Sequence, residues 1–248
     1  MAELYDEIGV GYRARRRPDP RLAAAITWAL GETETVVNVG AGAGSYEPAD
    51  RSVVAVEPAM TMIRQRSAGS APVVQASATE LPFRDDGFAA ALAVLTVHHW
   101  PDRARGLDEL GRVARRRVVV VTWDPVDFSF WLVDDYFPEL AAIDRQICPA
   151  IEEFRRALGH IEVYPLPIPH DCVDGFLGAY WRRPHAYLDA GVRSAISTFA
   201  KMTPSDVEAG LERLRRDLED GTWARRYGDL LDRAEIDLGY RIVVAAKR

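Results

Sequence analysis

A glycine-rich turn and a carboxylate at the end of the next apolar run are the residues whose types and spacing first indicate chemistry. The stretch VVNVGAGAGSYEP, residues 36–48, places Gly40, Gly42 and Gly44 directly after a short apolar run. Glycine has no Cβ, so a strand ending in glycines lets a ligand approach the backbone closely. Glu57 ends the run VVAVE, where a carboxylate can accept two hydrogen bonds from a ribose diol. These features favour an adenosine-containing ligand over the alternative of a structural turn beside a solvated glutamate.

The spacing of these glycines differs from the dinucleotide fingerprint. In G-x-G-x-x-G the last glycine would fall at position 45, which is Ser45, whereas the chain has G-x-G-x-G. A nicotinamide dehydrogenase is therefore disfavoured.

Two histidines follow the fourth apolar run, in HHW at residues 98–100. In a doubly wound fold the carboxyl ends of the strands are where ligands bind. An unperturbed imidazole titrates near neutrality, so His98 and His99 are candidate bases, and His99 is the candidate catalytic residue. The alternative is that one packs and the other bonds to the next helix.

The segments that must position these residues alternate between strand and helix through Trp123. Such alternation predicts an α/β fold with a doubly wound, Rossmann-like and mostly parallel sheet. Asp19, Pro20 and Gly31 mark both ends of the first helix. The expected strands cover 35–39, 52–57, 71–76, 88–97 and 117–123, and the expected helices cover 20–30, 59–69 and 101–115.

After Asp124 the pattern changes. An aromatic and acidic stretch is followed by HIEVYPLPIP, residues 160–169, which can form an edge strand because prolines interrupt it. Residues 171–233 are expected to be mostly helical, and residues 239–248 to form the last strand. We predict a core over residues 1–125, a helical region with one edge strand over 126–236, and a final strand returning to the core over 237–248.

Composition restricts the class of protein. The net charge of −6 over 248 residues argues against a nucleic-acid partner. The two cysteines lack metal-type spacing, and Asp124, Asp134 and Asp135 lack partners for a metal site, so no metal is expected. The start of the chain does not read as a secretory signal and no apolar run approaches the ~20 residues of a membrane span. We therefore expect a cytoplasmic protein without a membrane partner.

An ordered set of motifs carries a family resemblance. The set is the glycine turn, the strand-end Glu57, LPF before an acidic pair, FAAALAVLTVHHW and a strand ending in TWDP. Over roughly residues 5–124 it resembles class I S-adenosylmethionine-dependent methyltransferases, closest to the small-molecule type related to ubiquinone and menaquinone methyltransferases, the methyltransferase type 11 domain. The resemblance implies about seven strands with the last antiparallel, and a helical insertion before that strand.

The resemblance also implies a cofactor, S-adenosylmethionine, with S-adenosylhomocysteine as product. It places the glycine turn at the methionine part, Glu57 at the ribose, apolar side chains around the adenine and the end of the fourth strand beside the sulfonium. An amino-terminal segment would cover the cofactor and pair with its carboxylate. The implied cofactor-binding residues are Tyr12, Arg16, Asn38, Gly40, Ala41, Gly42, Glu57, Pro58, Met62, Ser77, Ala78, Leu95 and Thr96.

Three features depart from the family pattern. Asn38 and Ser77 stand where acids are usual, so Asn38 cannot offset the cofactor's ammonium charge. The segment from Gly44 to Glu57 is about one helical turn short and contains Pro48. The helix after the glycine turn should therefore be stunted or missing, with Tyr46 and Glu47 turned toward the site.

The resemblance implies that the insertion builds the acceptor pocket, for which His170, Tyr180 and Trp181 are the candidate binding residues. The predicted activity is methyl transfer to a small organic acceptor by a monomer or homodimer. The alternatives are a methyltransferase acting on RNA or protein, and a protein that binds S-adenosylmethionine without methylating. The absence of an NPPY-type motif after the fourth strand argues against the macromolecular alternative.

Overall fold

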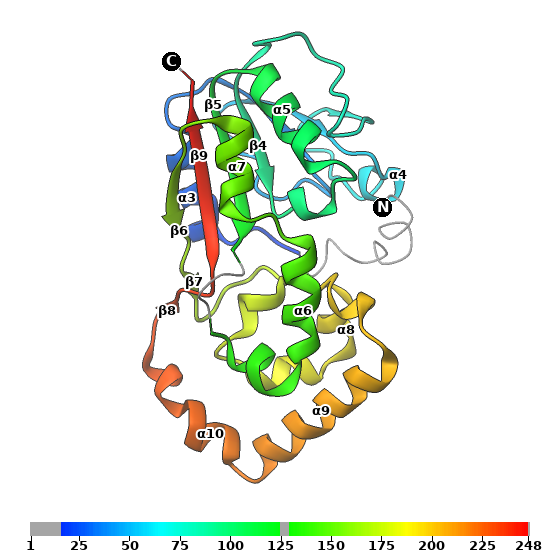
Figure 1. Ribbon diagram of the computed structural model, residues 1–248, viewed down its shortest axis with the longest axis vertical. Coiled ribbons are helices and arrows are strands. Elements are labelled where there is room, and N and C mark those ends of the chain that lie inside the picture. Colours follow the sequence, from blue (N-terminus) through cyan, green and yellow to red (C-terminus); the bar gives the residue numbers. More distant parts are fainter. Residues whose placement is uncertain (1–15, 125–128, 248) are drawn as a thin grey trace.

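The computed structural model describes residues 16–124 and 129–247, in which a mixed sheet carries an attached helical region (Figure 1). The sheet has seven strands in the order β3-β2-β1-β4-β5-β9-β6. Its strands are β1 Thr35–Val39, β2 Ser52–Val56, β3 Val73–Val74, β4 Phe88–Val94, β5 Ala114–Trp123, β6 Glu162–Pro165 and β9 Tyr240–Ala246. The first five run parallel, and β9 is antiparallel to both β5 and β6, which confirms the predicted topology.

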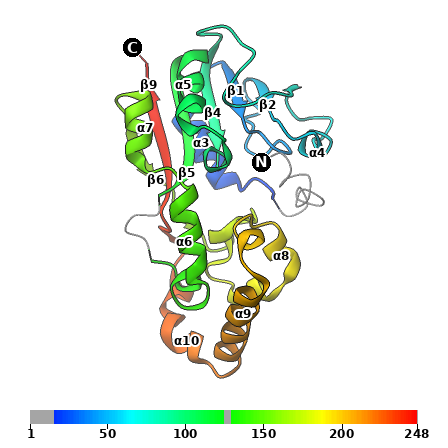
Figure 2. The same cartoon turned by 45° about the vertical axis from the view of Figure 1, so that its right-hand side comes forward.

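The central strands are buried on both faces because their side chains alternate between two apolar layers. Val119 and Val121 join the cluster beneath helix α3, whereas Val118 and Val120 join the cluster beneath α5 and α7. The flanking helices are α3 Pro20–Leu30, α5 Arg103–Val113 and α7 Ile151–Leu158, with the last two on the same side of the sheet (Figure 2).

The insertion before β9 lies beyond the carboxyl ends of β4 and β5 (Figures 1 and 2). It contains the helices α6 Pro138–Ile147, α8 Ala190–Ser194, α9 Pro204–Glu219 and α10 Thr222–Tyr227, a π-helical turn η2 Leu132–Tyr136, the 3₁₀ turns η3 Leu177–Tyr180, η4 Pro184–Leu188, η5 Phe199–Lys201 and η6 Gly228–Asp232, and the strand pair β7 Ile168–Pro169 and β8 Glu235–Ile236. Its buried aromatic residues belong to the same apolar cluster as the α3 face of the sheet.

The amino end of α3 forms as the sequence predicts. The Asp19 side chain caps it by accepting a hydrogen bond from the backbone N–H of Arg21, and Pro20 occupies the first turn. Gly31 ends the helix with a φ of 59°, a conformation that favours glycine.

The chain between β1 and β2 also forms as predicted. Residues 40–51, all of which the structure describes, form turns and bends rather than a helix. Tyr46 adopts a φ of 59°, which is uncommon for a bulky residue, and its buried side chain faces the interior. Glu47 instead pairs with Arg66, so the prediction that it faces the site is wrong.

Two regions are less helical than predicted. The helix expected over 59–69 is reduced to α4 Met60–Ile63, after which the Ser70 hydroxyl accepts the backbone N–H of Ser67 and stabilises a turn instead. Residues 171–203 form short 3₁₀ turns and α8 rather than long helices. The 3₁₀ turn η4 begins at Pro184, and the side chain of Asp189 caps α8.

The junction between α9 and η2 provides a test of packing. A Cβ on Gly210 would lie 2.2 Å from Phe137 Cε1 and 2.6 Å from the Tyr136 carbonyl oxygen. We predict that Gly210→Ala lowers the free energy of unfolding by about 1–3 kcal/mol through overpacking, despite the higher helix propensity of alanine. Urea unfolding measures the change.

The matched control is Gly111→Ala in α5, where the new Cβ would lie 3.7 Å from Leu158 Cδ2, an ordinary contact. There alanine should raise the free energy of unfolding by about 0.5–1 kcal/mol. Equal effects of the two substitutions would contradict the packing described for Gly210.

Candidate functional site

A cavity of ≈ 320 Å³ opens at the carboxyl ends of β1, β2 and β4, where doubly wound sheets bind ligands. We call it the sheet-edge cavity. Its lining residues are Arg16, Asn38, Gly40, Ala41, Gly42, Ala43, Ser45, Tyr46, Glu57, Pro58, Ala59, Met62, Ser77, Ala78, Val94, Leu95, Thr96, His99, Trp100 and Pro101. Every implied cofactor-binding residue except Tyr12, which lies outside the described residues, therefore lines this one cavity.

The glycine turn lies against the end of β4 so closely that only glycine fits. Gly40 has a φ of 72°, and a Cβ there would lie 2.1 Å from Thr96 Oγ1. The N–H groups of Gly40 and Ala41 both donate to the Val56 carbonyl oxygen, at 2.8 and 3.0 Å. The N–H groups of Gly40 and Ala41 are therefore already paired within the sheet, although both residues line the cavity.

Glu57 is held in place by the turn that it faces. Its Oε2 accepts the Gly42 N–H at 2.8 Å and its Oε1 accepts the Ala59 N–H at 2.9 Å. Burial raises the pKa of this carboxyl, and the two N–H groups act in the opposite direction. A carboxylate oxygen can accept more than one hydrogen bond, so the bidentate site expected for a ribose diol is intact.

Apolar side chains form a slot beside Glu57. Met62 is buried and packs with Ala43 and Ala59, and Pro58 and Ala78 complete the lining. Methionine suits the face of a flat ring because its side chain is flexible and polarizable. The Ser77 hydroxyl is within 2.8 Å of the Thr79 hydroxyl and accepts the Thr79 N–H, so it caps the next turn.

A buried carboxylate from the insertion joins the amino-terminal segment to the glycine turn. Asp174 has 1% of its side chain exposed and accepts hydrogen bonds from Arg16 Nε at 2.6 Å and from the Tyr46 hydroxyl at 2.8 Å. The Asp19 carboxylate also accepts the Val173 N–H. Arg16 thus lines the cavity while paired with a protein carboxylate. Asp174 was not among the sequence candidates, since only DG at 174–175 marks the position as a turn.

Substitution of Tyr46 tests the link that Asp174 makes between the insertion and the glycine turn. Tyr46→Phe removes one of the donors to the buried Asp174 carboxylate, so we predict a loss of about 1.5–3 kcal/mol in the free energy of unfolding. The control Tyr164→Phe removes a hydroxyl that bonds to Glu162 in solvent, and its effect should stay within about 0.5 kcal/mol. Chemical unfolding of both variants would distinguish them, and losses of equal size would contradict the link.

The chain turns sharply after β4. Leu95 has a φ of 49°, a backbone conformation that bulky residues rarely adopt. Residues held in such conformations are found most often at functional sites. The turn leads into η1 Val97–His99, which brings His99 to the sheet-edge cavity.

Both histidines of η1 are uncharged at neutral pH. Burial lowers the pKa of His98 to about 3, and the positive charges of Lys201, Arg16 and Arg103 act in the same direction. Burial also holds the pKa of His99 well below its usual value. Each imidazole is therefore neutral, with one ring nitrogen unprotonated but only weakly basic, and a catalytic role for His99 stays a prediction.

A second, smaller cavity of ≈ 80 Å³ lies between the sheet and the insertion, and we call it the junction cavity. It shares Arg16, Leu95 and His99 with the sheet-edge cavity. Its other lining residues are His98, Trp123, Asp144, Cys148, Phe176, Leu177, Ala195, Ile196, Ser197, Thr198 and Tyr240.

A buried carboxyl lies in the junction cavity. Asp144 in α6 accepts a hydrogen bond from Thr198 Oγ1 at 2.9 Å, and burial raises its pKa to about 6. Local sequence does not reveal this residue, because its surroundings come from η5 and the ends of β5 and β9.

The raised pKa of Asp144 gives a pH-dependent stability. Below the usual pKa the carboxyl is protonated whether or not the chain is folded. As pH rises to about 6 the unfolded chain loses the proton first, so stability falls by about 3 kcal/mol and stays lower above that pH.

The isosteric Asp144→Asn cannot ionise. It should therefore raise the free energy of unfolding by up to about 3 kcal/mol at pH 7.5 and by little at pH 4. Urea unfolding at both values checks this. A gain of the same size at pH 4, or a loss at pH 7.5, would contradict a buried ionised carboxylate.

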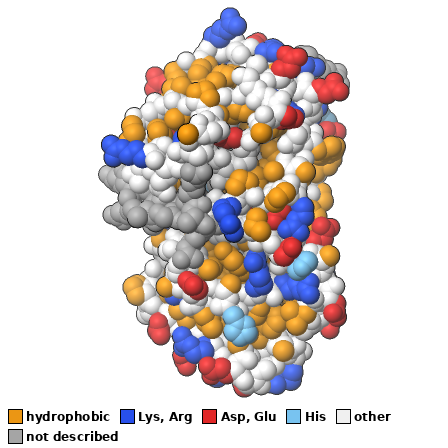
Figure 3. Space-filling view, turned by 180° about the vertical axis from the view of Figure 1, so that it is seen from behind, with side chains coloured by type: hydrophobic (Ala, Val, Ile, Leu, Met, Phe, Trp, Pro, Cys, Tyr) orange, Lys and Arg blue, Asp and Glu red, His pale blue; other side chains and the backbone are white. Residues whose placement is uncertain are grey.

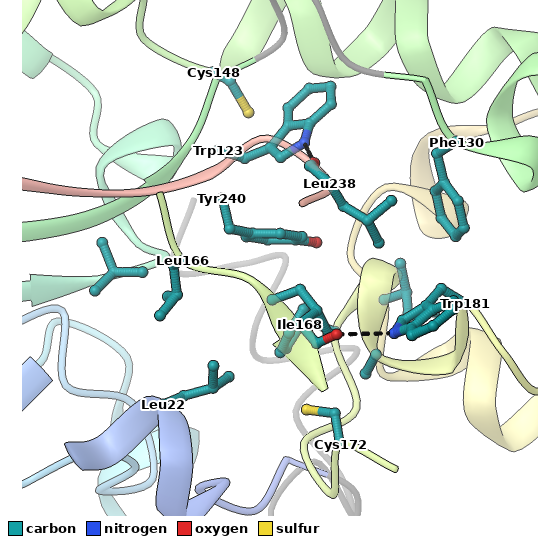
Figure 4. Close-up of a cluster of buried hydrophobic side chains, with 14 of the residues drawn as sticks. Leu22, Trp123, Phe130, Cys148, Leu166, Ile168, Cys172, Trp181, Leu238 and Tyr240 are labelled. Carbon is teal, nitrogen blue, oxygen red and sulfur yellow. Dashed lines mark hydrogen bonds between the residues drawn. The ribbon is translucent and has the colours of Figure 1, made fainter. Parts of the chain in front are cut away.

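The three residues predicted to bind the acceptor do not line either cavity. His170 is half-buried, and its Nδ1 lies 3.1 Å from the Ala234 carbonyl oxygen. Trp181 is fully buried and its Nε1 donates to the Ile168 carbonyl oxygen (Figure 4). Tyr180 packs edge-on against Tyr187, with Arg183 over its ring. Trp181 and Tyr180 pack within the insertion, and binding of the acceptor by these three residues stays a prediction. The aromatic residues Phe130, Trp131 and Tyr136 are likewise buried in the insertion's core.

Further observations concern other classes of function. Across residues 16–124 and 129–247, no group of three His, Cys, Asp or Glu side chains is placed to hold a metal ion. In the same part of the chain, helices long and apolar enough to cross a bilayer are absent. Basic side chains on the face seen in Figure 3 are interspersed with acidic and hydrophobic ones. The predictions about nucleic acid and oligomeric state stay predictions.

Comparison with known proteins shows the family to which the chain belongs. A family described as a methyltransferase domain matches residues 37–122. The chain is 33% identical to a protein of Anabaena variabilis, provisionally described as a methyltransferase from an antibiotic biosynthesis pathway. The match to its crystal structure has a TM-score of 0.83 and covers 93% of this chain and 98% of that one.

Two curated relatives match over shorter stretches. The uncharacterized methyltransferase YcgJ of Bacillus subtilis is 28% identical over 120 residues, which cover 44% of each chain. The chloroplastic 2-methyl-6-phytyl-1,4-hydroquinone methyltransferase 2 of Oryza sativa is 31% identical over 85 residues, 34% of this chain and 24% of that protein. The chain thus matches less than half the length of these two relatives.

Proposed function

This chain belongs to the class I S-adenosylmethionine-dependent methyltransferases, and from that premise we propose that it transfers the methyl group of S-adenosylmethionine to a small organic acceptor. The observation that carries the proposal is the single cavity at the sheet edge. It gathers the glycine turn, the Glu57 carboxylate, an apolar slot and the end of β4.

The residues present fit the cofactor. Gly40 packs against Thr96 so closely that a Cβ cannot be accommodated, which holds the turn beside the end of β4, and Glu57 lines the cavity with both carboxylate oxygens fixed by backbone N–H groups. Met62 and Pro58 offer apolar faces for the adenine. Asn38 lines the cavity as a neutral residue, so the charge of the cofactor's ammonium group is not offset from β1.

The chain's own contribution to the reaction is alignment and exclusion of water. Bound S-adenosylmethionine supplies an electrophilic methyl group on a sulfonium, which an electron-rich atom of the acceptor displaces in line. Leu95 and Thr96 would hold the reacting end of the cofactor, and Leu95 also lines the junction cavity from which an acceptor can approach. Alignment of two reactants alone accounts for about 7–11 kcal/mol of barrier lowering in favourable cases.

A small acceptor fits the surroundings of the reacting end better than a macromolecule. The insertion covers this side of the sheet (Figure 1), and the junction cavity that adjoins Leu95 has a volume of only ≈ 80 Å³. The hydroquinone methyltransferase of Oryza sativa supports the same proposal, since its name specifies a small acceptor.

Cofactor binding is the first test. Titration calorimetry should show binding of S-adenosylmethionine and S-adenosylhomocysteine at micromolar concentrations, and no comparable binding of NAD. Glu57→Ala removes both carboxylate oxygens expected at the ribose, so the Kd for S-adenosylmethionine should rise by at least about tenfold. Glu57→Gln keeps one oxygen acceptor, so its Kd for S-adenosylmethionine should lie between those of the unaltered protein and of Glu57→Ala.

Glu208→Gln on the exposed face of α9 is the matched control and should bind like the unaltered protein. A lack of binding by the unaltered protein, or a preference for NAD, would contradict the proposal. Where the cofactor binds, formation of S-adenosylhomocysteine with small acceptors, RNA and protein in parallel tests the acceptor class. Turnover only with RNA or protein would overturn the small-acceptor part, and binding without any turnover would indicate a non-methylating protein.

A further inference from the structure

We propose that the junction cavity is the acceptor site and that Asp144 selects an uncharged aromatic ring carrying a hydrogen-bond donor, such as a phenolic hydroxyl. This inference rests on the proposed function, because it supplies the substrate class for the same reaction. The argument uses the carboxylate's free oxygen, the charges around the cavity and the shape of its walls.

One oxygen of Asp144 is available to a ligand. The Thr198 hydroxyl donates to Oδ1, and within residues 16–124 and 129–247 no group donates a hydrogen bond to Oδ2. The residue as a whole has only 7% of its surface exposed, and it lines the junction cavity. A largely buried carboxylate with only one oxygen hydrogen-bonded is costly, and a ligand O–H or N–H at the other oxygen would offset that cost.

The charges around the cavity favour a neutral ligand. Arg16 lines the cavity, and the positive charges of Lys201, Arg16 and Arg103 act on His98 in its wall. Arg16 and Arg103 are paired with Asp174 and Glu153, so the charge that opposes an ammonium group is that of Lys201, which acts on both Asp144 and His98, together with the cofactor's own sulfonium. The Asp144 carboxylate opposes a carboxylate or phosphate at the same place, because like charges repel strongly where water is excluded.

The walls favour a flat ring. Trp123, Phe176 and Tyr240 contribute aromatic faces or edges, and Trp123 and Tyr240 lie close together at the adjoining ends of β5 and β9 (Figure 4). The volume of ≈ 80 Å³ is smaller than the ~150 Å³ cavity that can hold benzene. The junction cavity would therefore enclose only the donor-bearing part of a single ring, and the rest of the ring would lie along Leu95, which lines both cavities.

The aromatic residues and the carboxylate come from separate parts of the chain. Asp144 lies in α6 and Cys148 follows the end of that helix, where its N–H donates to the Asp144 carbonyl oxygen, while Thr198 precedes η5. The site therefore exists only when the insertion is packed on the sheet, and Asp144 can set acceptor choice without touching the residues that hold the cofactor.

The test measures binding of simple aromatic probes to the protein saturated with S-adenosylhomocysteine, by ligand-observed NMR titration. The probes are phenol, anisole, benzylamine and benzoate, which share one ring and differ in donor and charge. Phenol should bind with a Kd about tenfold lower than anisole, which lacks the donor, and lower than either charged probe. Equal binding of phenol and anisole, or tighter binding of a charged probe, would overturn the proposal without any variant being needed.

Variants then assign the preference to Asp144. Asp144→Leu, which keeps the shape but removes the acceptor, should abolish the difference between phenol and anisole. Its affinity for S-adenosylhomocysteine should be unchanged. Asp108→Asn on the exposed face of α5 is the control and should keep the phenol preference. A phenol preference that survives in Asp144→Leu would refute the role of Asp144. Failure of the unaltered protein to bind S-adenosylhomocysteine would instead remove the proposed function on which the inference rests.

Discussion

The buried Asp174 carboxylate is the interaction on which the arrangement of the site depends. A charge with 1% of its side chain exposed is stable only when it is paired and hydrogen-bonded. Its partners come from the amino-terminal segment, through Arg16, and from the glycine turn, through Tyr46. Three segments far apart in the sequence must therefore assemble together. Because Arg16 and Tyr46 also line the sheet-edge cavity, packing of the insertion and formation of the cofactor site are one event.

The two cavities differ in the residues that line them: most of those of the sheet-edge cavity follow the strands, whereas most of those of the junction cavity belong to the insertion. The sheet edge supplies backbone and carboxylate groups fixed by short hydrogen bonds, which suits a cofactor common to a whole family. The junction cavity combines aromatic walls with a carboxyl whose ionisation opposes folding. A buried polar residue that lowers the free energy of unfolding is typical of functional sites, since packing alone would favour an apolar side chain at that position.

The alternation of strand and helix, the antiparallel last strand and the missing helix after the glycine turn were all predictable, because each rests on local spacing or on a family motif. Val118 to Val121 face opposite layers in alternation, which periodicity reveals. The predicted helix content was too high over residues 59–69 and 171–203. Side chains such as Ser70 and Asp189 form local hydrogen bonds that compete with helix, and their outcome depends on neighbours that local sequence does not specify.

The sequence by itself determined the cofactor side of the site: Gly40, Glu57, Leu95 and their neighbours each follow a strand, and parallel strands bring their carboxyl ends to one edge. Only the tertiary structure decided the acceptor side. It placed Trp181 in the core and left His170 half-buried away from both cavities, and it brought Asp144 to Thr198 across 54 residues and Asp174 to Tyr46 across 128 residues. Such pairs have no fixed spacing, because they form where irregular segments pack against one another, and burial and charge pairing in the folded chain select them.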